Sequence, residues 1–139
     1  MRILQSVFFG GLIVALGCGD SGPTLAPLSG TVTFKGHPVP AGYISFTPGV
    51  GAGRICVVQI KDGKYNTADM VGAKGVHPGA NTVKIAGFDG KVVKLWGQGK
   101  QIFNPVGDKY TVPAGASTKD FVVPDSAGVN VKIEPTSDD

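Results

Sequence analysis

Residues 29–48 read Ser-Gly-Thr-Val-Thr-Phe-Lys-Gly-His-Pro-Val-Pro-Ala-Gly-Tyr-Ile-Ser-Phe-Thr-Pro, and this stretch decides the fold class. Val32 and Phe34 alternate with more polar residues in its first half, and Ile44 and Phe46 do so in its second half. Because successive side chains of a strand point to opposite faces, the alternation predicts two half-buried strands. The segment between them contains two glycines and two prolines, which are typical of a connection. We therefore expect an opening hairpin that the rest of the chain covers and extends.

The composition agrees with an all-β protein. The chain has 139 residues, a length typical of one domain. It contains 22 glycines and 10 prolines but a single glutamate, Glu134, so strong helix formers are sparse and short strands joined by turns are favoured. The formal net charge is +3 and is spread along the chain, so we expect no nucleic-acid partner.

Further segments of strand character follow at short intervals. Asp62-Gly63 and Asp89-Gly90 each lie beside extended segments, as the favoured two-residue hairpin turn does. Residues 91–103 lack a period and predict a long loop or irregular hairpin, partly packed on the sandwich. Together the pattern predicts an all-β fold, a single Greek-key sandwich of about seven strands over residues 28–135, followed by a tail at 136–139.

The alternation also predicts which residues form the inner layer of this sandwich. They are Val32, Phe34, Ile44, Phe46, Val58, Val83, Ile85, Phe121, Val129, Val131 and Ile133. Their neighbours along the chain are mostly polar, so the opposite faces are expected to lie in water.

The first seventeen residues have the features of a secretory signal. Arg2 supplies a positive charge, and residues 7–17 form an apolar run. That run is too short for a membrane-spanning helix, which needs about 20 apolar residues. We therefore assign residues 1–17 to a signal peptide that is not part of the fold.

The end of this segment predicts a lipid anchor. Ala15-Leu16-Gly17-Cys18 resembles the lipobox of bacterial lipoproteins, in which the signal is cleaved before the cysteine and both the thiol and the new N-terminus are acylated. Ala15 departs from the pattern, which usually has leucine there. The resemblance implies lipidation of Cys18, a tether over residues 18–27 and attachment to the cell membrane or outer membrane. The alternative is an ordinary signal peptide cut at the Ala-x-Gly site, with Cys18 incidental.

The order of turn and core residues in the domain is similar to that of carboxypeptidase regulatory-like, or transthyretin-like, domains, above all to those of small bacterial lipoproteins. The residues that carry the resemblance are Gly30, Val32, Phe34, Gly36, Pro38, Val39, Gly42, Ile44, Phe46, Pro48, Asp62, Gly63, Lys64, Tyr65, Pro78, Gly79, Val83 and Ile85, with Lys109, Tyr110 and 121–133 near the end. Asn81 departs from the pattern, which usually has an aromatic residue there. The resemblance implies a transthyretin-like or immunoglobulin-like sandwich without catalytic groups.

No arrangement of residues predicts an enzyme, a metal site or a cofactor. His37 and His77 each precede a proline and lie forty residues apart, whereas a metal needs two or three converging ligands. Asp62 and Asp89 are explained by their turns. Cys56 lies in an apolar, β-branched run, so we expect a buried and unreactive thiol.

Two functions fit these observations. The first is a membrane-anchored, non-catalytic interaction or structural module of the bacterial envelope, which binds another envelope protein or a glycan through an edge strand or loops. The second is a small-ligand or glycan binder in which Trp96, with Lys94 and Lys100, contacts the ligand. A tryptophan that covers the edge of the core is the simpler explanation of Trp96.

Overall fold

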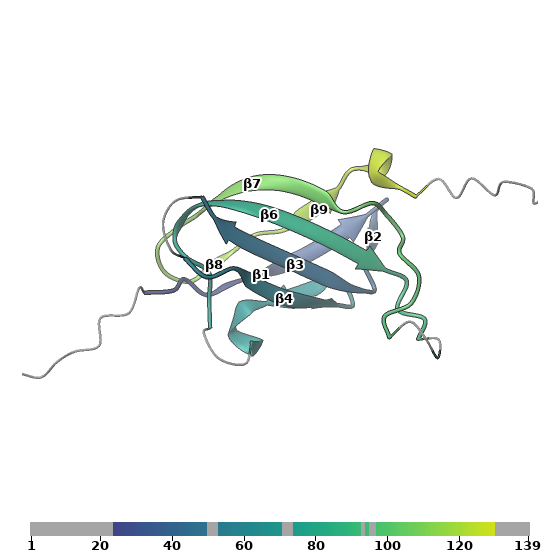
Figure 1. Cartoon of the computed structure of the whole chain (residues 1–139), viewed down its shortest axis with the longest axis horizontal. Helices are drawn as coiled ribbons and strands as arrows, with labels where there is room; N and C mark the ends of the chain where they lie inside the picture. Colours follow the sequence, from purple (N-terminus) through teal and green to yellow (C-terminus); the bar gives the residue numbers. More distant parts are fainter. Residues whose placement is uncertain (1–23, 50–52, 71–73, 93, 95–96, 130–139) are drawn as a thin grey trace, which may run out of the picture.

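The computed structural model describes residues 24–49, 53–70, 74–92, 94 and 97–129, and this part of the chain is all-β (Figure 1). Two short 3₁₀ helices, η1 and η2, interrupt the strands. The elements in chain order are β1 Leu28–Phe34, β2 His37–Pro38, β3 Ala41–Pro48, β4 Cys56–Lys61, β5 Lys64–Asn66, η1 Thr67–Asp69, β6 Gly79–Phe88, β7 Val106–Val112, β8 Ser117–Thr118, β9 Phe121–Val123 and η2 Asp125–Ala127. The predicted fold class is confirmed.

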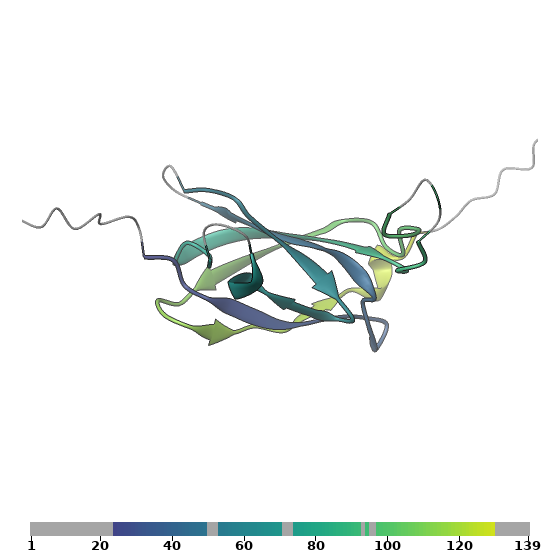
Figure 2. The ribbon, with the colours of Figure 1, turned by 90° about the horizontal axis from the view of Figure 1, so that it is seen from below.

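The strands form one curled sheet whose two halves face each other. The hydrogen-bonded order is β2-β1-β5-β4-β3-β6-β7, and β8 and β9 also pair with β1, in parallel. Seen from below, β1 lies with β8 and β9 in one layer, while β3, β4 and β6 lie in the other (Figure 2). The architecture is therefore a β-sandwich, closed along one side by the β4–β5 turn.

Aromatic rings join the two layers. Phe46 on β3 lies 6.2 Å from the ring of Tyr65 on β5 and 6.3 Å from that of Phe121 on β9, measured between centroids. Tyr65 and Phe121 lie 6.0 Å apart. All three are buried, and such tilted pairs contribute beyond the area that they bury. Around them pack Val32, Ile44, Val58, Val83, Ile85 and Val123.

The prediction that the two strands of the opening stretch form a hairpin is wrong. β1 turns at Lys35-Gly36, both with positive φ, and pairs with β2, whereas β3 pairs with β4 and β6. The chain between β2 and β3 crosses from one layer to the other. There the carbonyls of Val39 and Pro40 accept hydrogen bonds from the N–H groups of Gly63 and Asp62, so the crossing segment holds the β4–β5 turn.

Of the two predicted Asp-Gly turns, one is confirmed and one is wrong. Asp62 and Gly63 have φ of 50° and 74° and join β4 to β5, as a two-residue turn with both central residues left-handed requires. Asp89 instead closes a loop of residues 89–100. Its Oδ1 accepts from the N–H groups of Lys91 at 2.9 Å and Lys100 at 3.0 Å. These hydrogen bonds hold the pKa of its carboxyl below the usual range.

The described residues of the predicted loop 91–103 form no named strand, and the end of this segment packs on the sandwich. Phe103 is fully buried, and its ring lies 5.0 Å from that of Phe34. The ring also lies against Gly87, where any Cβ would collide with it. Glycine at this position therefore lets the loop close over the end of β6.

The predicted inner layer is confirmed along the central strands but not at the last one. Val32, Ile44, Phe46, Val58, Val83, Ile85 and Phe121 are buried, and Phe34 packs on the core while partly exposed. Val129, by contrast, follows η2 outside any strand and is 37% exposed, so its inward placement is wrong. The positions predicted beyond it, Val131 and Ile133, lie outside the described residues. At the other end, Ala26 is already buried and bridges Val76, two residues before the predicted start of the domain.

The face assignment of β3 predicts a contrast between two adjacent residues. Phe46→Ala should lower the free energy of unfolding by about 3–5 kcal/mol, because it empties a fully buried aromatic position between the layers. Thr47→Ala, on the opposite and partly exposed face, should cost under about 1 kcal/mol. Denaturant unfolding of both variants beside the wild type measures this. Equal losses would show that the faces of β3 are misassigned.

Candidate functional site

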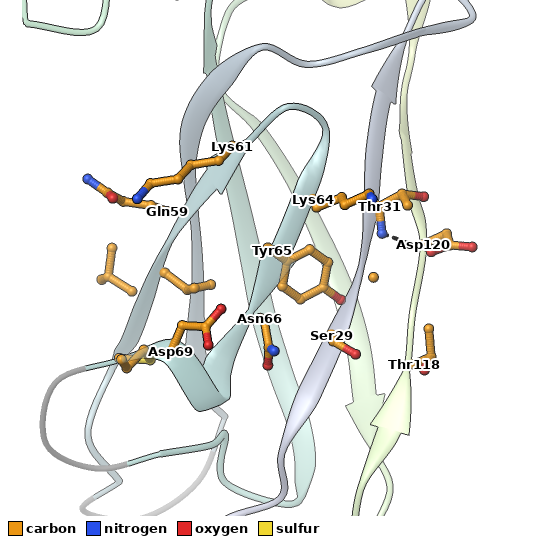
Figure 3. Close-up of a pocket in the computed structure, with 14 residues that line it drawn as sticks. Ser29, Thr31, Gln59, Lys61, Lys64, Tyr65, Asn66, Asp69, Thr118 and Asp120 are labelled. Carbon is orange, nitrogen blue, oxygen red and sulfur yellow. Dashed lines mark hydrogen bonds between the residues drawn. The ribbon is translucent and has the colours of Figure 1, made fainter.

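The described surface carries an open groove of about 750 Å³ between β4 and β5, bordered on the far side by β1 and the segment around β8 (Figure 3). Apolar side chains supply part of its lining, and polar ones supply the rest. The lining residues are Ser29, Gly30, Thr31, Val57, Val58, Gln59, Lys61, Lys64, Tyr65, Asn66, Asp69, Met70, Thr118 and Asp120. We take this groove as the candidate functional site.

The groove exists because β4 and β5 separate immediately after their turn. The two strands share one paired position, Lys61 with Lys64. β4 then follows β3 along six pairs, while β5 pairs with β1 through Asn66, Tyr65 and Lys64. The two strands of one hairpin thus belong to opposite layers of the sandwich, and the space between them stays open.

Tyr65 anchors the β5 side of the groove. Its hydroxyl donates a hydrogen bond to the carbonyl of Lys119 at 2.6 Å. Burial, with smaller contributions from Tyr110 and Asp120, raises the pKa of the Tyr65 hydroxyl, so it stays a donor at any physiological pH. This bond ties β5 to the two residues between β8 and β9, on the other side of β1.

Several polar side chains of the lining already make hydrogen bonds within the fold. Asp120 Oδ1 accepts from the N–H of Thr31 at 2.9 Å, and Asn66 Oδ1 caps η1 through the N–H of Ala68 at 3.0 Å. Gln59, Lys61 and Lys64 are exposed, and their side chains make no hydrogen bond to other described residues. These three side chains are therefore available to a ligand.

Charge is unevenly distributed along the groove. Lys61 and Lys64 stand directly opposite each other at the turn end, and Asp69 lies at the other end of the groove (Figure 3). Their side chains diverge, that of Lys61 toward Gln59 and that of Lys64 toward Thr31 (Figure 3). The turn end of the groove therefore carries a positive charge on each side, which favours a negatively charged group of a ligand.

Cys56 lies behind the groove rather than in it. The side chain is 6% exposed, and its thiol lies 3.3 Å from the sulfur of Met70, which lines the groove. Burial raises the pKa of the Cys56 thiol to about 11. The expected burial of Cys56 is thus confirmed.

The two histidines do not form a site in the described part of the chain. His37 is exposed on β2, and Nε2 of the partly buried His77 accepts from the N–H of Arg54 at 3.2 Å. Among the described residues, no three His, Cys, Asp or Glu side chains gather as metal ligands would. None of the helices in that part is long and apolar enough to cross a bilayer.

The residues that the sequence analysis singled out lie elsewhere. Lys94 and Lys100 are both exposed in the loop of residues 89–100. Trp96 and Cys18 lie outside the described residues, so a contact surface at Trp96 and lipidation of Cys18 stay predictions. The loop itself is fastened to β3, because Gln98 donates a hydrogen bond from Nε2 to the hydroxyl of Tyr43.

The sequence analysis missed the groove. Its lining combines residues from β1, β4, β5 and the β8–β9 segment, and the pairs that bring them together are up to 89 positions apart, as for Thr31 and Asp120. One local signal was present. Lys61 and Lys64 flank the Asp62-Gly63 turn, so the sequence alone places two lysines at paired positions there.

The comparisons with known proteins add no relative. No family model matches the chain, and no curated protein or solved structure matches it significantly.

The environment of Cys56 predicts slow chemistry at its thiol. In a Cys18→Ala variant Cys56 is the only cysteine, so labelling by a thiol-specific reagent reports on it alone. At pH 8 the native protein should react slowly, because the thiol is buried and almost no thiolate forms below a pKa of about 11. The same protein in denaturant should react at the rate of a free cysteine. Rapid labelling of the native state would contradict the burial of Cys56.

Proposed function

We propose that this chain is an exported, lipid-anchored and non-catalytic domain that holds another component of the bacterial envelope. The observation that carries the proposal is the open groove between β4 and β5. A groove with apolar side chains, a few free polar ones and no built-in occupant is the usual form of a binding site.

The chemistry of the lining favours binding over catalysis. The lining contains neither histidine nor cysteine, and the hydroxyls of Ser29, Thr31 and Thr118 make no hydrogen bond to a described side chain that could act as their base. Its two carboxylates differ in role, because Asp120 is held by the N–H of Thr31 while Asp69 lies at the far end. The likeness of the sequence pattern to non-catalytic transthyretin-like domains points in the same direction.

The position of the first core residue suits a domain held close to a membrane. Ala26 is buried and lies eight residues after Cys18 in the sequence. Eight steps span at most about 27 Å when fully extended. An acylated Cys18 would therefore keep the groove within a few nanometres of the lipid surface, where other envelope components are concentrated.

The anchor is tested by a single substitution. Wild-type protein should partition into the detergent phase of a cell extract, because two or more acyl chains on Cys18 bind a membrane stably. Cys18→Ala should move to the aqueous phase, and Ala15→Leu, which restores the usual lipobox residue, should partition as the wild type does. Unchanged partitioning of Cys18→Ala would rule out lipidation at this residue.

The binding role is tested by capture from an envelope extract. Tagged full-length protein should retain a specific component, and adding excess untagged protein should displace it. Digesting the retained material with protease or with glycan hydrolases then separates a protein partner from a glycan. If nothing is retained above a tag-only control, the proposed function fails.

A further inference from the structure

We propose that the open side of β4 binds an extended peptide segment of the partner by strand addition, an inference that rests on the proposed binding function. The residues that would receive the peptide are Val57 and Gln59. In this mode the peptide adds a strand, and main-chain hydrogen bonds provide most of the contact.

The turn between β4 and β5 determines to which side the main-chain N–H and C=O groups of β4 point. In a two-residue hairpin the residues that flank the turn, here Lys61 and Lys64, exchange both main-chain hydrogen bonds. The N–H and C=O groups of alternate residues point the same way, so those of Gln59 and Val57 point toward β5 as well. The N–H of Asp62 points the opposite way and donates to the carbonyl of Pro40 at 2.9 Å, which agrees with this alternation.

These main-chain groups have no partner in the described part of the fold. β5 pairs with β4 at Lys61 alone, and no other described main-chain group bonds to Val57 or Gln59 on that side. Both residues line the groove, and the side chain of Val57 is 50% exposed. Two donors and two acceptors thus face an open space, although buried or half-buried main-chain groups are normally paired.

The contrast with β7 shows that this edge is unprotected. β7 pairs only with β6 among the described strands, and it carries the exposed charged residues Asp108 and Lys109. Charged residues on edge strands prevent pairing with other chains. The open positions of β4 bear valine and glutamine instead, which leave an incoming strand free to pair.

The lining also predicts the chemistry of the peptide. A residue opposite Val58 would point inward, toward Tyr65 and Met70, so it should be apolar. At the turn end, Lys61 and Lys64 favour an acidic residue, and at the other end Asp69 favours a basic one. The ligand is therefore an extended segment with alternating apolar residues, acidic at the end nearest the Asp62-Gly63 turn.

Synthetic peptides test this on the unaltered full-length protein in detergent. The probe Glu-Val-Thr-Val-Thr-Val-Lys and its charge-reversed counterpart Lys-Val-Thr-Val-Thr-Val-Glu place the valines on the inward face and the charges on the outward face, for the two possible strand directions. One of them should bind, and methylating the main-chain nitrogens of one alternate set of residues should abolish binding more than methylating the other set. Equal effects of the two sets, or no binding of either probe at millimolar concentration, would overturn strand addition.

Matched variants locate the site. Gln59→Pro removes a main-chain donor that the fold does not use and should weaken the better probe by roughly tenfold. Gln59→Thr changes the side chain but keeps the main-chain N–H. Its Kd for the probe should therefore stay within about threefold of the wild-type value, a smaller change than the loss of one hydrogen bond causes. If Gln59→Pro does not fold, Val57→Pro and Val57→Thr make the same comparison. Equal binding by the proline and threonine variants would show that the site is elsewhere.

Failure here is distinguishable from failure of the proposed function. If Gln59→Pro still captures the envelope partner as well as the wild type does, strand addition is wrong while the binding function stands. If the wild type captures nothing, the proposed function itself is wrong.

Discussion

The structure depends on the position of one side chain, Tyr65. Its ring packs against both Phe46 of one layer and Phe121 of the other, and its hydroxyl donates a hydrogen bond to the carbonyl of Lys119. These contacts hold β5 in the layer of β1, although its turn joins it to β4 in the opposite layer. The same contacts therefore close the core and keep β4 and β5 apart, so the groove is a consequence of how the sandwich is closed.

Much of the fold could be predicted because it is encoded locally. Alternation along a strand identifies the buried face of Val32, Ile44 and Phe46, and the Asp62-Gly63 turn follows from the preference of these residues for positive φ. The choice of partner strand is not local. Nothing in the alternation distinguishes a β1–β3 hairpin from the observed crossing between layers, which is held by hydrogen bonds from the distant turn to Val39 and Pro40.

The candidate site could not be predicted for the same reason. A groove formed by two strands that part is a property of the pairing, and neither Gln59 nor Asn66 has a side chain that signals a site in the sequence. The sequence analysis named Trp96 as the contact residue of its alternative function, because an isolated tryptophan among lysines is a conspicuous local feature. Val129 was wrongly assigned to the inner layer because its alternating pattern with the residues that follow suggested a strand. That pattern gives no sign of the short helix η2, which ends just before it.

Amide hydrogen exchange of the peptide-free protein, resolved by residue, tests the central claim most directly. The N–H groups of Val58 and Ile60 point toward β3, so they should be among the slowly exchanging amides of the core. Those of Val57 and Gln59, in the same strand, should exchange much faster because they face the groove. Uniform protection along β4 would contradict the account, since it would mean that a further strand or segment already occupies its open side.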